Sequence, residues 1–569
     1  MQTKNNNSRG ELKGILNVAL KGFGFVSVLK DKKEDDIFIL KENLNGAVDG
    51  DTVKIRKGKK NKFEVVSIVS HNTKPLDIKQ IIKKYNLCEE FPDIVIAEAK
   101  KAAHFPTDEE PTIKSRLDLS KSKTIVTIDP ADARDLDDAV SLDENTDGTV
   151  TLGVHIADVS HYVKTDTELD KEAFKRATSV YFPDRVLPML PPALSNGICS
   201  LNPNERRLTL SVFIVLDKFY NIVKTDIKKT IICTDTRFSY EEVQDILDGK
   251  TKHKHSNMLS KMAEICEKFE KERFQRGEIA FNVPEPKIAL DKDGKIESVF
   301  AQVHTLSHRI IETFMILANE VVAETFNKLN LPFIYRIHEK PDPLKVAKFI
   351  GSLKPFAISH NLLPESATGQ KYQSMLDGIK DENLKVIIGS LALRSMQKAK
   401  YNNENIGHFG LGAQFYCHFT SPIRRYPDLV IHRIIKTFFD NQLSSHKLEL
   451  FKDFVITASE QSSKREIDAM EAEREVENMK RAEFMSGHIG ETFNGVVNGI
   501  TDFGIFVYLP ENTAEGLLRI ENIKNDKYKF NEEMQILIGK KGKIKMGDKI
   551  QVLVAGVNLR RAQIEFTTN

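Results

Sequence analysis

The sequence predicts a multidomain α+β protein, in which a central mixed α/β domain is flanked by small β-barrels. The chain has 569 residues, which is more than one domain usually contains. Short alternating strands broken by glycines occur near both ends, whereas the residues between them combine early strands with later helices. The predicted parts are a disordered tail at 1–9, a barrel at 10–71, a helical connector at 72–118, the central domain at 119–487 and a second barrel at 488–569.

The composition is that of an ordinary globular protein, with 40% hydrophobic and 29% charged residues. A net charge of +2 excludes a polycation, so any surface for nucleic acid must come from local basic clusters. The five cysteines lie far apart without a C-x-x-C pair, which argues against disulfides and structural zinc and favours a reducing cytoplasm. The sequence shows neither a signal core nor a long apolar run, so we expect no membrane association.

The segment 10–71 combines aromatic and basic side chains. Phe23, Phe25 and Phe38 lie on short alternating strands. The basic side chains that follow are Lys54, Arg56, Lys57, Lys59, Lys60 and Lys62. Exposed aromatics can stack on bases while cations attract phosphates, and the segment resembles a cold-shock-type OB barrel. The alternative is that the three phenylalanines fill the barrel core and the lysines form a solvated face.

Helical patterns organise the segments that follow. The pattern of the connector predicts one or two helices, around 78–85 and 94–103, which would set the spacing between domains. In the central domain we expect helices at 307–329 and 384–400. The segment 463–486 carries many opposite charges four residues apart, which is typical of a long charged helix.

Five aspartates follow an apolar segment that predicts a strand at 125–128. They are Asp129, Asp132, Asp135, Asp137 and Asp138. Pro130 interrupts regular structure, so we expect the acids on a loop at the end of a strand. Carboxylates this close repel one another unless a cation lies between them, and Mg²⁺ suits such oxygen ligands. Acidic loops also occur as solvated turns and helix caps, but the apolar segments on both sides favour a metal site.

Several motifs together resemble one enzyme family. The pattern Ile-Asp-Pro-x-x-Ala-x-Asp-x-Asp-Asp-Ala at 128–139 is similar to the catalytic signature of the ribonuclease II/ribonuclease R (RNB) exoribonucleases. Further family-like motifs follow in order at 153–161, 178–183, 194–203, 394–396, 407–410 and 418–428. The resemblance implies an RNB catalytic domain at the centre of the chain. It is closest to the ribonuclease R branch, with a shortened N-terminal region, because only one cold-shock-type barrel is visible.

The resemblance also implies which acids carry the chemistry. Asp129, Asp135, Asp137 and Asp138 match the four catalytic positions of the family, whereas Asp132 falls at a variable position. We expect Asp129, Asp135 and Asp138 to hold one or two Mg²⁺ ions, with Mn²⁺ as an alternative, against the scissile phosphate. Asp137 would orient the attacking water or tune its proton transfer.

A proline-bracketed loop, Ser-Pro-Ile-Arg-Arg-Tyr-Pro at 421–427, carries two arginines. Arg424 matches the phosphate-contacting arginine of the family, and its planar guanidinium suits bidentate contact with a phosphate better than a lysine would. The alternative for a lone arginine is a surface salt bridge, which the rigid loop and the motif make less favourable. We interpret Arg425 as structural.

By the same resemblance, further side chains would grip the RNA. Tyr181 and Phe281 match an aromatic clamp on the terminal bases, although core packing is the ordinary role of an isolated aromatic. Glu473 aligns with an acid that contacts RNA near the site, with a surface helix acid as the alternative. Tyr240 and Glu312 align with groups that choose ribose over deoxyribose.

The C-terminal segment 488–569 returns to short strands and resembles the RNA-binding OB module first known from a ribosomal protein. Phe503 and Phe506 flank a glycine on an alternating strand there, so they would contact RNA bases.

Histidines near the motifs could suggest a zinc site, but they show no recognised ligand spacing. We interpret His155 and Asp158 as scaffold groups with satisfied hydrogen bonds.

These observations predict a Mg²⁺-dependent hydrolytic 3′-to-5′ exoribonuclease that degrades single-stranded RNA processively to 5′-mononucleotides. We expect it to act as a monomer in the cytoplasm, in RNA turnover. One alternative is a non-catalytic RNA-binding regulator on the same scaffold, which would lack some of the acids or Arg424. Another is an unrelated Mg²⁺ phosphatase or nuclease, which would need no stacking barrels at its termini. All matched positions are present, which favours the exoribonuclease.

Overall fold

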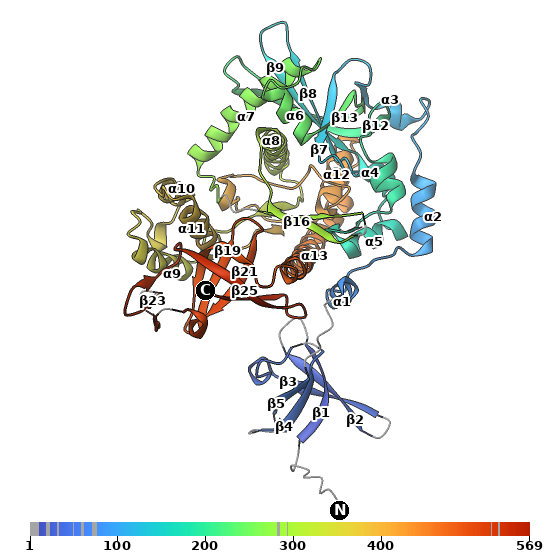
Figure 1. The fold of residues 1–569 in the computed structure, drawn as a ribbon. Coiled ribbons are helices and arrows are strands. Elements are labelled where there is room, and N and C mark those ends of the chain that lie inside the picture. The colour runs from blue at the N-terminus through green and yellow to red at the C-terminus, as the bar shows by residue number, and fades with distance from the viewer. Residues whose placement is uncertain are drawn as a thin grey trace, which may run out of the picture.

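The computed structural model describes residues 11–18, 23–30, 33–48, 50–58, 62–70, 77–281, 285–292, 294–524, 526–532 and 535–568. The tail predicted at 1–9 lies outside these residues, as do Lys59 and Lys60. A small barrel, a large α/β body with a long helix, and a second barrel follow one another along the chain (Figure 1). The predicted fold class, a multidomain α+β protein with barrels on both sides of a mixed α/β domain, is confirmed.

Five strands close the N-terminal barrel in the order β1-β2-β3-β5-β4. They are β1 (Glu11–Val18), β2 (Gly24–Lys30), β3 (Lys33–Ile39), β4 (Thr52–Lys57) and β5 (Phe63–Ser70). Because side chains alternate between the faces of a strand, Leu16, Val26 and Ile55 fill the interior. Phe25 and Phe38 pair across β2 and β3 and are 37% and 46% exposed. These two rings therefore lie on the outer face of the barrel and not in its core.

A helical connector leads from this barrel to the body. Its helices are α1 (Ile78–Lys84), α2 (Asp93–Ala102) and α3 (Pro111–Lys114). The Asp77 side chain caps α1 by accepting a hydrogen bond from the backbone N–H of Lys79. Ile81 of α1 shares a buried cluster with Ala472 of the long helix α13 (Ser445–Ser486). The connector is therefore anchored on α13.

A seven-stranded mixed sheet forms the centre of the body, in the order β14-β7-β8-β9-β12-β13-β6. Its strands are β6 (Leu117–Asp118), β7 (Ile125–Asp129), β8 (Asp138–Glu144), β9 (Val150–Ala157), β12 (Arg206–Leu216), β13 (Ile222–Cys233) and β14 (Thr236–Ser239). The sheet, α8 (Leu306–Lys328) and α12 (Tyr426–Phe439) contribute to one continuous hydrophobic core. This core supports the strand ends that carry the aspartates.

The remaining elements of the body surround this core. They are α4 (Val159–Tyr162), α5 (Glu168–Arg176), α6 (Tyr240–Leu247), α7 (Ser256–Arg276), α9 (Pro343–Leu353), α10 (Gly369–Asp377), α11 (Glu382–Ser395), β10 (Val180–Tyr181), β11 (Val186–Leu187), β15 (Pro286–Leu290), β16 (Ile296–Ala301), β17 (Tyr335–Ile337) and β18 (Lys400–Asn402). Across the part of the chain described above, no helix combines the length and apolar character needed to cross a membrane.

Two helices differ in length from the prediction. α13 begins at Ser445 and not at 463, because burial of Val455 and Ala458 stabilises its first half without the charge pairs that marked its second half. α11 ends at Ser395 and not at 400, because β18 leaves the helical path to pair with β17.

The C-terminal barrel closes in the order β19-β20-β21-β26-β25. Its strands are β19 (Thr492–Ile500), β20 (Gly504–Leu509), β21 (Ala514–Arg519), β25 (Lys549–Asn558) and β26 (Gln563–Thr567), with a small sheet of β22 (Lys529–Asn531), β23 (Ile536–Ile538) and β24 (Lys543–Ile544). Its core includes Ile387 of α11 and Met485 of α13, so this barrel is packed onto the body. Arg561 donates to the backbone carbonyl of Gly46 (2.6 Å), which joins the two barrels directly.

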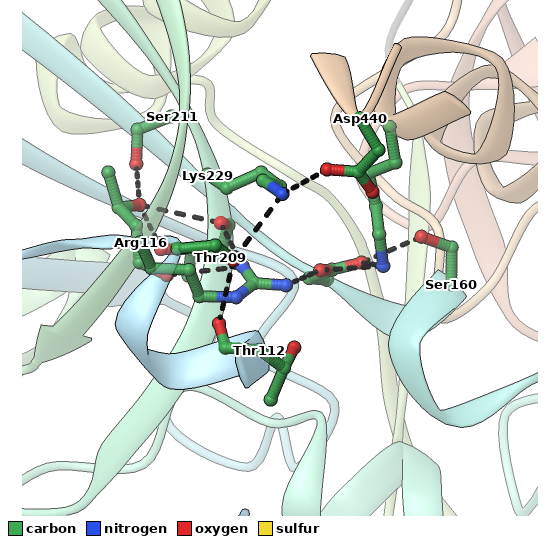
Figure 2. A network of polar contacts seen from close by, with 11 residues as sticks. Thr112, Arg116, Ser160, Thr209, Ser211, Lys229 and Asp440 are labelled. Carbon is green, nitrogen blue, oxygen red and sulfur yellow. Dashed lines mark hydrogen bonds and ion pairs between the residues drawn. The ribbon is translucent and has the colours of Figure 1, made fainter. Parts of the chain in front are cut away.

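A buried polar network joins the central sheet to α12 (Figure 2). Arg116 donates to the backbone carbonyls of Thr209 (3.0 Å) and Thr230 (3.3 Å) and forms an ion pair with Asp158. Lys436 of α12 donates to both carboxylate oxygens of Asp158. Although burial acts to raise it, the pKa of the Asp158 carboxyl is held well below its usual value by Lys436 and Arg116. Asp158 is thus a satisfied scaffold group, as predicted.

Candidate active site

A loop between two neighbouring strands carries the aspartates. Asp129 ends β7, Asp138 begins β8, and residues 130–137, here called the aspartate loop, connect them. β7 and β8 pair antiparallel, so these two strand ends lie side by side. The loop borders a pocket of about 1350 Å³, whose lining includes all five aspartates. The prediction that these acids lie at the end of a strand is confirmed.

Asp137 lies beside the predicted phosphate-binding arginine. Its Oδ1 accepts a hydrogen bond from the backbone N–H of Ile423 (2.8 Å), and its Oδ2 lies 3.7 Å from Nε of Arg424. Burial raises the pKa of the Asp137 carboxyl well above its usual value, although the Arg424 charge opposes this. Arg424 itself stays about half exposed in the pocket lining, so its guanidinium remains accessible to a substrate. Arg425 also lines the pocket, but its guanidinium forms an ion pair with the buried Asp428 (2.7 Å), which agrees with the structural role expected for it.

Asp129 and Asp138 are half-buried residues whose carboxylate charges repel. Burial, followed by repulsion from Asp138, raises the pKa of Asp129 well above its usual value. Burial raises the pKa of Asp138 to about 6. Within the described structure, Asp129 Oδ2 is buried without a hydrogen-bond partner. A cation would offset both the repulsion and the missing hydrogen bond. The donor set therefore fits a Mg²⁺-like ion, for which one or two protein carboxylates suffice alongside water and substrate phosphate.

Asp135 is directed to a different partner, because its Oδ2 accepts a hydrogen bond from the Tyr181 hydroxyl (2.9 Å). Among the residues that the structure describes, no three His, Cys, Asp or Glu side chains are gathered into a ready-made metal site. The predicted ligands Asp129, Asp135 and Asp138 are thus brought to one pocket but are not assembled around one point. Asp135 could become a ligand through its other oxygen, Oδ1, or through both oxygens after turning away from Tyr181.

Tyr181 connects this pocket to the long helix α13. Its backbone N–H donates to Glu473 Oε1 (2.7 Å), and its ring is 40% exposed. Burial raises the pKa of the Glu473 carboxyl to about 7. Glu473 is therefore not an ordinary surface acid: it accepts from the backbone of the residue whose hydroxyl reaches Asp135.

Tyr240 and Glu312 also line the pocket. Tyr240 begins α6 directly after Ser239, which is opposite Asp129 in the parallel pairing of β14 with β7. Burial raises the pKa of the Tyr240 hydroxyl, and Asp138 and Asp129 add to the effect. His308, one turn before Glu312 on α8, stacks on the Tyr240 ring with centroids 3.9 Å apart and planes at 14°. This stack is not predicted from the sequence, although the four-residue spacing of His308 and Glu312 places both side chains on one face of α8.

Phe281 is not brought to the pocket lining with Tyr181. Its half-buried side chain packs against a separate hydrophobic cluster that includes Ile388 and Tyr372. Its backbone approaches α11 closely: a Cβ on Gly389 would lie 2.7 Å from the Phe281 carbonyl oxygen. Phe281 therefore contributes to core packing here. Of the two residues predicted to form the aromatic clamp, Tyr181 lines the pocket and Phe281 does not.

Aromatic side chains gather on the outer surfaces of both barrels. In the N-terminal barrel, the ring centroids of Phe23, Phe25 and Phe38 are 5.3–5.7 Å apart. In the C-terminal barrel, Phe503 is 48% exposed and its ring centroid lies 6.3 Å from that of Phe506. Exposed rings can stack on nucleic-acid bases, whereas buried rings cannot.

His155, which we predicted to be a scaffold residue, has a hydrogen-bond partner at each ring nitrogen. His155 contacts Ser141 Oγ (3.0 Å) through Nε2 and Ser211 Oγ (2.7 Å) through Nδ1. Burial lowers its pKa to about 3, so it stays neutral. Both ring nitrogens are occupied by hydroxyl groups, which leaves neither nitrogen for a metal ion.

Three family models match the chain in order: a Ribonuclease B OB domain at 14–65, an RNB domain at 116–441 and an S1 RNA binding domain at 488–569. A carboxylate pocket within an RNB domain, in a chain that also carries an S1 RNA binding domain, defines a nuclease that acts on RNA. The chain belongs to the ribonuclease II/ribonuclease R family of RNB-domain proteins. It is an exoribonuclease that degrades RNA in the 3′-to-5′ direction, and the nucleases of its family are metal-dependent hydrolases.

Individual relatives agree with this assignment. Ribonuclease R of Thermotoga maritima is 39% identical over 96% of this chain and 78% of its own length. Ribonuclease R 1 of Lactococcus lactis is 39% identical over 86% of this chain and 60% of its own length. Among solved structures, Mycoplasma genitalium RNase R in complex with ribose-methylated single-stranded RNA matches with a TM-score of 0.82 at 27% identity, covering 98% of this chain and 100% of that one.

Proposed function

We propose that this exoribonuclease is Mg²⁺-dependent and hydrolytic, and that it degrades single-stranded RNA processively to 5′-mononucleotides. The observation that carries the proposal is the half-exposed guanidinium of Arg424 in one pocket with the buried carboxyl group of Asp137 and the half-buried Asp129 and Asp138. Such a pocket attracts a divalent cation and a phosphate at the same place, which is the arrangement that phosphodiester hydrolysis requires.

Asp129 and Asp138 would hold the ion, and Asp135 would join them after releasing Tyr181. When bound, Mg²⁺ supplies positive charge against the phosphoryl oxygens and favours ionisation of the attacking water. The number of ions, one or two, and the use of Mn²⁺ in place of Mg²⁺ are part of the same proposal. Burial raises the pKa values of Asp129, Asp137 and Asp138, and an arriving cation would favour their ionised forms because its charge offsets their repulsion.

Asp137 and Arg424 would act on the scissile phosphate itself. Arg424 is positioned to donate hydrogen bonds to phosphoryl oxygens as their negative charge grows. Asp137 keeps one oxygen on the Ile423 N–H, and its second oxygen would orient the attacking water and take up its proton. Ile423 thereby fixes the direction in which Asp137 presents its free oxygen.

Tyr181 would stack on a terminal base, and the exposed aromatics of both barrels would hold the strand further from the site. Phe281 is retained in this proposal only as an indirect contributor, through the cluster against which it packs. Tyr240 and Glu312 would contact the ribose 2′-hydroxyl and so favour RNA over DNA. Glu473 would support Tyr181 from α13.

One chain supplies the whole pocket, so a monomer suffices, and the five unpaired cysteines agree with a reducing cytoplasm.

Incubation of 5′-labelled oligo(A) RNA with Mg²⁺ or with EDTA tests this function. We expect progressive shortening from the 3′ end with Mg²⁺ and intact RNA with EDTA. Addition of excess unlabelled RNA after binding separates the two modes of degradation: processive action carries the engaged molecules to short products, whereas distributive action stops. RNA that stays bound but unshortened in the presence of Mg²⁺ would contradict the catalytic assignment.

A further inference from the structure

The aspartate loop is held by a side chain that does not line the pocket. Arg237 lies on β14, the parallel neighbour of β7, two residues before the Ser239 that is opposite Asp129. Its Nη2 donates to the backbone carbonyls of Ala131 (2.9 Å) and Ala133 (2.7 Å). Among the described residues, those lining the pocket include Ala133 but not Arg237. Arg237 thus acts on the backbone of the loop from outside the pocket.

The second half of the loop is held separately. Ser200 Oγ donates to the carbonyl of Arg134 (2.8 Å) and accepts from the backbone N–H of Leu136 (3.1 Å). Arg237 therefore holds the loop at Ala131 and Ala133, after Asp129, whereas Ser200 holds the residues on either side of Asp135. Fixing these carbonyls fixes the backbone from which both carboxylates project.

We propose that Arg237 is a positioning residue of the metal site: it holds the backbone between Asp129 and Asp135 so that their carboxylates can bind a divalent ion, and it contacts neither the ion nor the RNA. This inference rests on the metal dependence proposed above. Side chains that support metal ligands from outside typically contribute about 10- to 100-fold to metal affinity. We expect an effect of this size on ion binding and none on RNA binding without ions.

Titration of the RNA-free full-length protein with Mn²⁺, followed by calorimetry, tests the proposal. Arg237→Met keeps a long side chain but removes both the charge and the donors, so we expect about 10- to 100-fold weaker Mn²⁺ binding. Arg237→Lys keeps the charge and can donate to both carbonyls from one nitrogen, as Nη2 does, so we expect it to restore most of the affinity. Arg206→Met is the matched control, because Arg206 pairs with Asp108 on the surface and should leave Mn²⁺ binding unchanged.

A Met variant that binds Mn²⁺ as tightly as the wild type overturns the inference, and so does a Lys variant no better than Met. A loss of RNA binding in EDTA that equals the loss of Mn²⁺ binding also overturns it, because it would show a general structural role. If the wild type itself binds no Mn²⁺, the proposed metal dependence fails together with the inference. Should the Met variant not fold, Arg237→Gln replaces it, and wild-type affinity in that variant would overturn the proposal.

Discussion

At the scale of single residues, the two oxygens of Asp137 have different surroundings. Oδ1 accepts a hydrogen bond from the Ile423 N–H, whereas Oδ2 has no hydrogen-bond partner among the described residues and lies 3.7 Å from Nε of Arg424. Asp137→Asn keeps an oxygen for the Ile423 N–H and changes little volume, but it removes the negative charge. We expect the rate of RNA hydrolysis to fall by about 10²- to 10⁴-fold while RNA binding survives. The variant loses the group that assists proton transfer but keeps the shape of the pocket.

Gel-shift titration in EDTA and single-turnover hydrolysis with Mg²⁺ measure these two properties for Asp137→Asn. Asp132→Asn is the control on the same loop, since Asp132 is exposed at the pocket edge and matches a variable position. Equal losses of binding and of hydrolysis in the Asp137 variant would contradict its assigned role.

The stability of the ion-free protein should depend on the titration of Asp138. Burial raises its pKa from an ordinary value of 3.8 to about 6, so the folded state favours the protonated form. The contribution of the protonated Asp138 carboxyl to the free energy of unfolding is fully present below pH 3.8 and is lost as the pH rises through about 6. A shift of this size corresponds to about 3 kcal/mol. In EDTA we therefore expect the free energy of unfolding of wild type to fall over this range relative to Asp138→Asn.

Urea unfolding at a series of pH values measures this difference, and comparison with Asp138→Asn separates Asp138 from the other carboxyl groups. Added Mg²⁺ should stabilise the wild type more at pH 8 than at pH 5, because ion binding requires the ionised carboxylate. A difference between the two proteins that does not change with pH would count against a raised Asp138 pKa.

At the scale of elements, α13 and β10 bring Tyr181 to the proposed metal site. Glu473 of α13 accepts from the Tyr181 N–H, and the Tyr181 hydroxyl donates to Asp135. Tyr181→Ala should weaken single-stranded RNA binding by about 1–3 kcal/mol, because the stacking surface is lost. Tyr181→Phe should bind RNA like the wild type and instead bind Mn²⁺ more readily, since Asp135 is then released.

Fluorescence anisotropy with labelled RNA in EDTA and Mn²⁺ calorimetry without RNA measure these effects for the two Tyr181 variants. If Phe weakened RNA binding as much as Ala, the hydroxyl and not the ring would be the contact. If Phe left Mn²⁺ binding unchanged, the hydrogen bond to Asp135 would not restrain that carboxylate.

Local patterns were sufficient to predict some of these elements and not others. The apolar segment before Asp129, the interruption by Pro130 and the motif around Arg424 lie within short stretches, so strand, loop and pocket residues could be predicted. The start of α13 could not, because its first half is stabilised by burial of residues such as Val455 against the body. The roles of Arg237 and His308 could not be predicted for a related reason. They depend on the pairing of β14 with β7 and on the packing of α8 against α6, which join segments distant in the sequence.

At the scale of the whole molecule, the two barrels differ in their attachment. The C-terminal barrel shares a core with Ile387 and Met485 of the body, so its deletion would uncover apolar surface. The N-terminal barrel connects through α1 and through the contact of Arg561 with Gly46. Substitution of exposed rings is therefore a cleaner test of RNA capture than removal of residues 488–569.

Phe503→Ala combined with Phe25→Ala should weaken the capture of long RNA more than the hydrolysis of short oligonucleotides. Both rings are exposed and remote from the aspartates along the chain, and each stacked base contributes about 1–3 kcal/mol. The ratio of kcat/KM for long and short RNA measures the effect, and the buried core neighbour Val26 must be left intact so that the barrel still folds. A short oligonucleotide should reach the pocket without the barrels, so its KM should change least. An equal loss for both lengths would place these rings outside the path of the RNA and would leave Tyr181 and Arg424 as the main determinants of substrate binding.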